Sequence, residues 1–297
     1  MGLYDSYLFY RKFDMNNDHS KYTIWKIYHD ENQIKNYKLC ENERIYLFNT
    51  TNNGYEGKHI NQLNRFICEG TGILYPYLNN LKSDIIGFQH YRRWFHSKLT
   101  NIKYNEITDG KIQIFTNGFR MRTNYDAIYP VKYKDCASHF AFWKIINNGF
   151  YQDFINFLTT EFPEFLESLK ERNMFHQYSI FICNWDNYIK LCDILWGYIN
   201  FIANRYHFDL YNDLDWSSFI EEHFILYNRN NDIVPRKCKW SDILYGHDNW
   251  FTLPYDHPNH FQYGLYRILS FNIEYIVSAF ANYIGYIFDE NNKLVLI

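Results

Sequence analysis

The segment from Ile86 to Phe95, IGFQHYRRWF, contains residues whose side chains could bind a ligand or take part in catalysis. An apolar run ends in His90 and Tyr91, and two arginines, Arg92 and Arg93, follow directly. A guanidinium group is permanently charged and matches the geometry of phosphate oxygens. Two of them at one place can neutralise a departing diphosphate. The alternative is that both arginines pair with surface carboxylates, as many exposed arginines do.

A second polar pair follows an earlier apolar segment. Residues 24–28, IWKIY, are typical of a strand, and His29 and Asp30 come directly after them. In a doubly wound sheet, nucleotides bind beyond the carboxyl ends of the strands. His29 and Asp30 are therefore candidate contacts to a base and ribose, and a surface turn without a ligand is the alternative.

Strand-like and helix-like segments alternate along the chain. Strands are expected at residues 24–28, 44–48, 84–88, 125–130 and 179–183. Helices are expected at residues 64–80 with a bend or end at Pro76, 141–150, 151–172 with a break near Pro163, and 185–202. This order predicts an α/β fold with a mostly parallel central sheet flanked by helices.

Length and composition bound the domain organisation. The chain has 297 residues, of which 47% are hydrophobic, so it can bury a substantial core. We expect one main domain at residues 1–228. Residues 229–297 are expected to form a C-terminal extension whose terminal helix packs on the same domain.

Charge and cysteine content exclude several classes of protein. The net charge is −3, and no basic patch interleaves with the aromatic residues, so nucleic acid is not an expected partner. No signal peptide is evident, and no stretch reaches the roughly 18 uncharged apolar residues of a membrane span. The six cysteines form no CxxC pair, which disfavours a zinc ribbon. Buried thiols in the cytoplasm are the expected state.

The segment around the two arginines resembles a known family. Residues 63–95, LNRFICEGTGILYPYLNNLKSDIIGFQHYRRWF, are similar to bacterial capsular and exopolysaccharide biosynthesis proteins with an HYRR signature. That family is catalogued as of unknown function and is related to glycosyltransferases of the GT-A type. The matching positions are Cys68, Glu69, Thr71, Gly72, Asp84, Ile86, Gly87, His90, Tyr91, Arg92, Arg93 and Phe95.

The similarity continues to about residue 227. Further matching positions are residues 125, 126, 128 and 130, His139, and residues 162–165, 173–175, 179–182 and 219–222. The chain departs from the family pattern at residues 74–80, at residues 176–178 and at His223, where the family has arginine. These departures concern the choice of acceptor more than the binding of a donor.

The resemblance implies a GT-A-like nucleotide-binding fold in residues 1–228. It implies a glycosyltransferase of polysaccharide biosynthesis that moves a hexose from a nucleotide sugar, a UDP-sugar, to a glycan or glycoconjugate. The donor-binding candidates are His29, Asp30, Glu69, His90, Tyr91, Arg92 and Arg93. Glu69 is expected to orient Arg92, to contact the donor sugar, or to serve as a structural carboxylate. A non-catalytic carbohydrate-binding or scaffold protein on the same fold is the alternative function.

Metal use is open at this point. Related GT-A enzymes hold a divalent metal on the diphosphate with a DxD motif, and here His90, Tyr91 and Arg92 occupy that place. We expect the arginines to replace the metal, because hard cations prefer carboxylate oxygens. In the alternative, His90 helps to hold Mn or Mg.

Candidates for the base that deprotonates the acceptor hydroxyl come from later segments. A carboxylate or histidine suits this step near neutral pH. The candidates are Asp126, His139 and Glu222, with Glu221 beside the last of them. A structural role is the alternative for each.

Overall fold

A computed structural model describes part of the chain in detail. The described residues are 22–34, 45–50, 56–90, 93–94, 103–114, 118–120, 148–166, 174–176, 179–206, 210, 225–227, 233–235, 268–287 and 295–296. The strand expected at residues 125–130 lies outside them. The same holds for most of the helix expected at residues 141–150.

The described part contains twelve strands and eight helical elements. The strands are β1 (Tyr22–Tyr28), β2 (Ile45–Asn49), β3 (Ile85–His90), β4 (Arg93–Trp94), β5 (Ile112–Ile114), β6 (Gly118–Arg120), β7 (Met174–His176), β8 (Phe181–Asn184), β9 (Ile225–Tyr227), β10 (Ile233–Pro235), β11 (Tyr286–Ile287) and β12 (Val295–Leu296). The helical elements are η1 (Glu31–Ile34), η2 (Asn61–Leu63), α2 (Asn64–Ile67), α3 (Gly70–Leu78), α4 (Tyr104–Thr108), α6 (Asn148–Glu161), α8 (Trp185–Tyr206) and α12 (Ile268–Ile284).

A central mixed sheet organises these elements. Its strands follow the order β11-β5-β8-β3-β1-β2, with β4 paired to β3 and β12 paired to β4. Three of the five neighbouring pairs along that described path are parallel. The two antiparallel pairs both involve β8. The expected α/β class with a mostly parallel sheet is confirmed, and β8 is its reversed strand.

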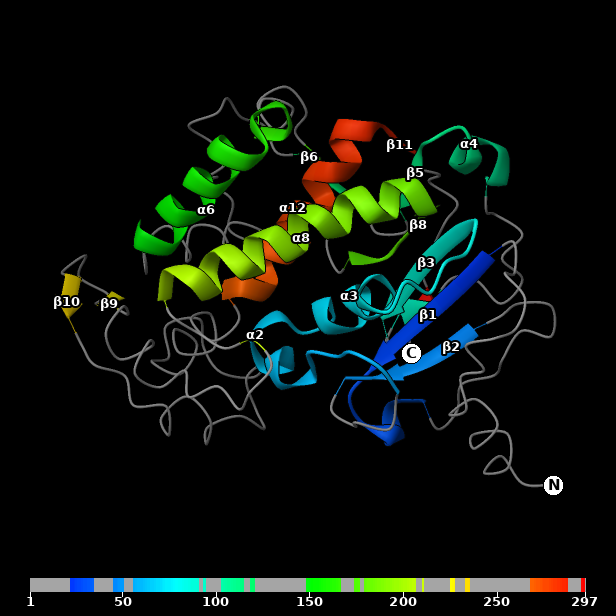
Figure 1. Cartoon of the computed structure of the whole chain (residues 1–297), viewed down its shortest axis with the longest axis horizontal. Coiled ribbons are helices and arrows are strands. Elements are labelled where there is room, and N and C mark those ends of the chain that lie inside the picture. The colour runs from blue at the N-terminus through cyan, green and yellow to red at the C-terminus, as the bar shows by residue number, and fades with distance from the viewer. Residues whose placement is uncertain are drawn as a thin grey trace.

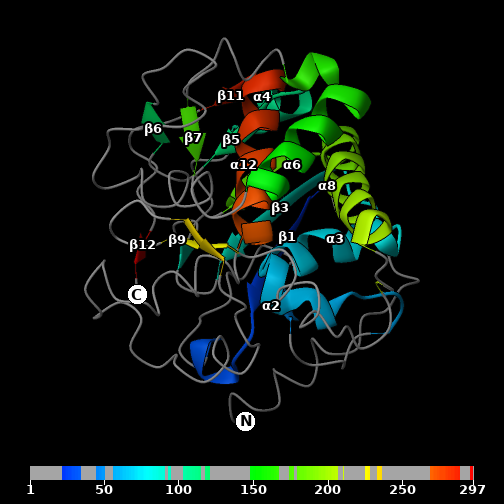
Figure 2. The ribbon, with the colours of Figure 1, turned by 90° about the vertical axis from the view of Figure 1, so that its left-hand side faces the viewer.

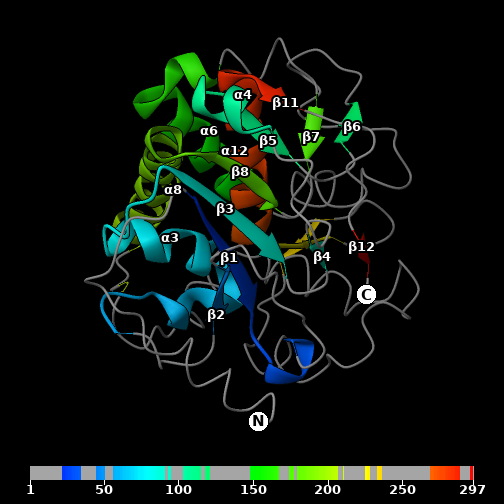
Figure 3. The same cartoon turned by 90° about the vertical axis from the view of Figure 1, so that its right-hand side faces the viewer.

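One face of the sheet carries the apolar core. Trp25 stacks on Tyr46 of β2 at 4.8 Å between ring centroids and meets the edge of Tyr75 on α3. Phe88 of β3 stacks on Tyr188 of α8 at 5.5 Å. Helices α3, α6 and α8 lie together on this side of β1 and β3 (Figures 2 and 3). These aromatic side chains therefore pack the sheet against the helices.

The opposite face of the same strands carries buried polar side chains among apolar ones such as Ile24 and Ile182. Lys26 and Gln89 are register neighbours on β1 and β3 and point away from the face that bears Trp25 and Phe88. Both are buried, as is Gln113 on β5. The carboxamide oxygen of Gln113 accepts a hydrogen bond from the backbone N–H of Lys103. The two faces of the sheet thus differ in chemistry.

Helices α3 and α8 are joined through a tyrosine hydroxyl. Pro76 lies inside α3, where proline interrupts the helical hydrogen-bond ladder. The hydroxyl of Tyr188 donates to the carbonyl of Ile73 at 2.6 Å and accepts from the backbone N–H of Tyr77 at 2.9 Å. It therefore satisfies both backbone groups from α8, the long helix that lies next to α3 in Figure 1.

Two expected helix boundaries are wrong. The single helix expected at residues 64–80 is two helices, α2 and α3, and the break falls at Cys68 instead of Pro76. The boundary expected between residues 150 and 151 does not exist, because α6 runs through it from Asn148 to Glu161. In both places tertiary packing overrides the local pattern.

The segment beyond residue 228 contributes to the same sheet. Helix α12 packs on α2 and α8, and β11 pairs in parallel with β5. Strand β12 pairs with β4, with Leu296 opposite Arg93. Within the described ranges, no helix has both the length and the apolar character to cross a bilayer.

The Tyr188 bridge predicts a specific loss of stability. Tyr188→Phe leaves the Ile73 carbonyl and the Tyr77 N–H without this partner, so unfolding should need about 1–3 kcal/mol less free energy. Urea denaturation measures the change. Tyr283→Phe is the matched control, because its exposed hydroxyl lies 3.4 Å from Glu164 and its removal should change stability by less than about 0.5 kcal/mol. Equal stability of both variants would contradict the bridging role.

Candidate functional site

The candidate site lies where three parallel strands end together. Strands β2, β1 and β3 are neighbours and run in the same direction, so Asn49, Tyr28 and His90 end them at one edge. Thr50 continues the first pairing, since its backbone N–H donates to the carbonyl of Tyr28 at 2.8 Å. This is the edge at which parallel α/β sheets bind ligands.

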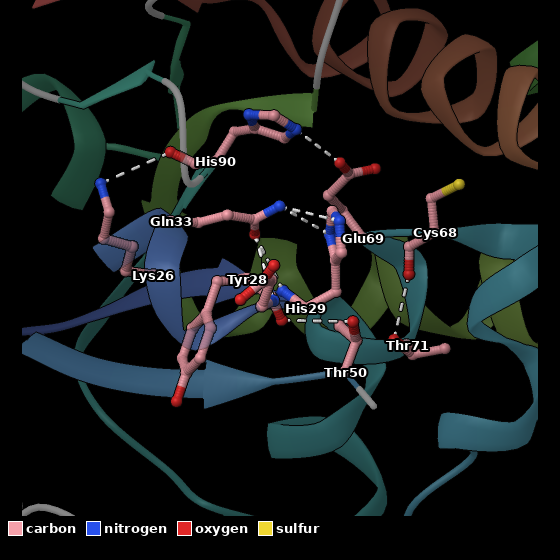
Figure 4. A network of polar contacts seen from close by, with 10 residues as sticks. Lys26, Tyr28, His29, Gln33, Thr50, Cys68, Glu69, Thr71 and His90 are labelled. Atoms are coloured by element: carbon pink, nitrogen blue, oxygen red, sulfur yellow. Dashed lines mark hydrogen bonds and ion pairs between the residues drawn. The ribbon is translucent and has the colours of Figure 1, made fainter. Parts of the chain in front are cut away.

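A short contact with a carboxylate fixes the imidazole of His90 at that edge. Its Nε2 atom lies 2.7 Å from Oε1 of Glu69. The histidine side chain is 5% exposed and the glutamate side chain 25%, so the pair is partly shielded from water. Figure 4 shows the carboxylate of Glu69 directed at the ring of His90. A described partner of Glu69 is therefore His90, which fits the paired structural carboxylate among the roles expected from the sequence, and the contacts to Arg92 or a donor sugar stay predictions.

Cys68, directly before Glu69, has a strained backbone conformation. Cys68 has φ 46° and ψ −121°, a conformation that non-glycine residues rarely adopt. The hydroxyl of Thr71 donates to the carbonyl of Cys68 at 3.0 Å and holds this turn between α2 and α3. Such strain persists only where surrounding contacts enforce it, and it concentrates at functional sites.

Two glycines let the helices come close enough for this arrangement. A Cβ atom on Gly72 would lie 2.8 Å from Ile27 of β1, and one on Gly70 would lie 2.7 Å from Ile273 of α12. Both distances are shorter than real Cβ contacts. Cys68 and Thr71 thus shape the turn that precedes α3 and includes Glu69, and Gly72 allows α3 to pack closely on β1.

The two arginines follow at a sharp reversal of the chain. His90 pairs with Arg93 across the antiparallel contact of β3 and β4. Only Tyr91 and Arg92 separate these partners in the sequence. Tyr91, Arg92 and the side chain of Arg93 lie outside the described residues. The hairpin therefore starts from the same residue that Glu69 holds.

His29 and Asp30 follow β1 at the same edge and are exposed. The amide nitrogen of Gln33 lies 2.8 Å from Nε2 of His29. Asp30 accepts a hydrogen bond from the backbone N–H of Asn32 at 2.9 Å, which begins η1. The carboxylate of Asp30 thus supports a local turn, while His29 is held by a side chain from the next turn of the chain.

The sequence did not single out Gln33. Its carboxamide oxygen also accepts from the backbone N–H groups of His29 and Asp30, so it organises the turn (Figure 4). A glutamine three residues after an aspartate at a turn resembles the spacing of a capping box, and this spacing could have indicated it. Asp126, His139, Glu221 and Glu222 lie outside the described residues.

The described residues at this edge offer few potential metal ligands. Among the residues that the structure describes, no group of three His, Cys, Asp or Glu side chains is placed to hold an ion. The described pair consists of His90 and Glu69, which already contact each other. A metal would need further ligands from outside this part of the chain.

The fold and this edge define an α/β protein with a candidate ligand site at the carboxyl ends of parallel strands. The chain belongs to the family described as a domain of unknown function, DUF4422, which matches residues 39–225. This match covers well over half of the chain and includes the whole segment from Glu69 to Arg93.

Comparison with other proteins adds little beyond the family. No curated protein matches the chain significantly. A solved structure titled as the apo form of WbbM, a bifunctional glycosyltransferase, is similar with a TM-score of 0.40 and 15% sequence identity. The similarity covers 88% of this chain and 42% of that chain, so this chain spans less than half of WbbM. A likeness at this level assigns neither a fold nor an activity.

The close approach of α3 to β1 predicts an unusual response to a helix mutation. Alanine normally stabilises a helix by up to about 1 kcal/mol relative to glycine. Gly72→Ala should instead destabilise by about 1–3 kcal/mol, because the new methyl group meets Ile27. Gly197→Ala in α8 is the control, since its Cβ would sit 3.4 Å from Phe157. Thermal denaturation compares them, and stabilisation by both would show that the α3–β1 contact is loose.

Proposed function

We propose that this protein is a glycosyltransferase that transfers a hexose from a UDP-sugar to a glycan or glycoconjugate. The support comes from the sequence resemblance to capsular and exopolysaccharide biosynthesis proteins of the GT-A-related type. The chemistry of the strand edge is compatible with it. A reducing compartment, where nucleotide sugars are available, also suits the buried thiols of Cys183 and Cys192, which form no disulfide.

One observation carries the proposal more than any other. Glu69 holds the imidazole of His90 at the carboxyl edge of β3, and His90 pairs directly with Arg93. His90 and the backbone of Arg93 therefore lie at the end of β3, at the edge where α/β sheets bind phosphate-bearing ligands. A diphosphate needs fixed positive charge at such a place.

In the proposed mechanism, Arg92 and Arg93 neutralise the diphosphate as the glycosidic bond to it breaks. Their guanidinium groups supply charge and paired donors without a proton transfer. Glu69 and His90 act on the orientation of this segment. His29 lies at the edge near the end of β1 and is assigned to the nucleoside, with Asp30 supporting its turn.

The acceptor side of the reaction rests on residues outside the described ranges. A base must take the proton of the acceptor hydroxyl as that oxygen attacks the anomeric carbon. Asp126, His139 and Glu222 remain the candidates for this role. Substitution of each by an isosteric amide or by alanine, with donor binding as a control, separates a base from a structural residue.

Donor binding tests the proposal directly. Isothermal titration of the purified chain should detect binding of UDP and UDP-sugars. Arg92→Ala should lower the affinity for UDP by about 10- to 100-fold, because a charge-assisted contact is lost. Lys111→Ala is the control for net charge, because it removes an exposed lysine that pairs with Glu106 beside β5, away from this edge. The proposal fails if no nucleoside diphosphate binds at millimolar concentration, with or without Mn.

A second measurement separates an enzyme from a non-catalytic binding protein. The enzyme should release sugar from the bound UDP-sugar slowly in water, and this hydrolysis should disappear in Arg92→Ala. Binding without release by the wild-type chain, even with candidate glycan acceptors present, would instead favour a carbohydrate-binding or scaffold role.

Metal dependence follows from the same assignment. If the arginines take the place of a metal, UDP affinity and the rate of sugar release should change less than about threefold in excess EDTA. Removal of a metal ion that the reaction requires would lower both much further. A loss of binding in EDTA that Mn restores would show that His90 works with a metal instead.

A further inference from the structure

Lys26 occupies an unusual position in the centre of the sheet. It lies on β1, with Leu47 of β2 and Gln89 of β3 as its register neighbours. Its side chain is fully buried, on the face opposite the aromatic core. Lysine is almost never fully buried in proteins, so this placement needs a reason.

The buried amine is a cost to folding. Burial lowers the pKa of Lys26 from 10.5 to about 7, because the charged form is poorly solvated there. The unfolded chain keeps its proton up to pH 10.5, so between these pH values folding releases a proton and is penalised. The penalty is largest below pH 7 and disappears as the pH rises through 10.5. An apolar side chain of similar length would fill the space without this cost.

The amine is directed at the end of the neighbouring strand. Nζ of Lys26 lies 3.5 Å from the carbonyl oxygen of His90. Figure 4 shows this contact on one side of His90 and the contact of its imidazole with Glu69 on the other. His90 is also the residue that pairs with Arg93 to close the hairpin. Its main chain and its side chain are thus held from opposite faces of the sheet.

We propose that Lys26 is a positioning residue that holds the carbonyl of His90 and hence the pairing of β3 with β4, beside which the proposed function places the diphosphate. Glu69 fixes the imidazole and Lys26 fixes the backbone of the same residue. The assignment to a diphosphate rests on the proposed function. The effect on the hairpin does not.

Lys26→Met tests the positional claim in the unliganded protein. The variant keeps the length of the side chain and removes the amine. Hydrogen exchange at residues 90–94 should become about tenfold faster, because one contact to the strand end is lost. The melting temperature should stay the same or rise, since a buried amine has been removed. A merely structural lysine would instead lower the melting temperature and speed exchange throughout the sheet.

The effect on the ligand is measured with UDP. Lys26→Met should raise the Kd for UDP by about tenfold while stability is maintained. Gln89→Met is the matched control: Gln89 is the register neighbour of Lys26, is equally buried, and makes no hydrogen bond through its Oε1 atom within the described residues. This variant should leave UDP affinity within about twofold.

The outcomes distinguish the two proposals. Unchanged exchange at residues 90–94 in Lys26→Met overturns the positioning role, whatever the affinity for UDP. Faster exchange together with unchanged UDP affinity overturns the link to the diphosphate. Faster exchange in a protein whose wild-type form binds no nucleoside diphosphate supports the positioning of the hairpin and refutes the proposed function alone.

Discussion

The contact between Glu69 and His90 is the interaction on which the described site depends. It joins the turn between α2 and α3 to the end of β3, across 21 positions of sequence, at 2.7 Å. A charge-assisted contact of this kind needs its geometry fixed in advance, because two mobile side chains would lose entropy in forming it. The surrounding structure supplies that fixation through the strained turn at Cys68, the hydroxyl of Thr71 and the close approach at Gly72.

The two faces of the sheet contribute differently to stability and to the position of the strand end at His90. The face toward α3 and α8 is packed with aromatic rings and contributes the stability of the fold. The other face carries buried polar groups such as Lys26 and Gln113, which contribute little to stability. In some proteins, buried polar groups specify one conformation at a cost in stability. Here the strand end at His90 receives contacts from both faces.

Much of this architecture follows from local sequence patterns. Apolar segments predicted β1, β2 and β3 to within about two residues, and the α/β class followed from their alternation with helices. The polar residues after those strands were also predicted to share an edge. The break at Cys68 was not predictable, because no glycine or proline stands at that position and the helices on either side pack on β1 and α12, which are distant in sequence. The partner of Glu69 and the burial of Lys26 depend on contacts between segments that are distant in sequence, which propensity alone does not specify.

The pairing of β4 with β12 has a consequence for the order of assembly. Trp94 and its partner Val295 are separated by about 200 positions. During synthesis β4 therefore cannot pair with β12 until most of the chain has been made. Closing such a long loop is slow, and until then one edge of β4 stays open to pairing with other molecules. The short length of β4, two residues, limits this exposure, since very short edge strands offer few groups for pairing.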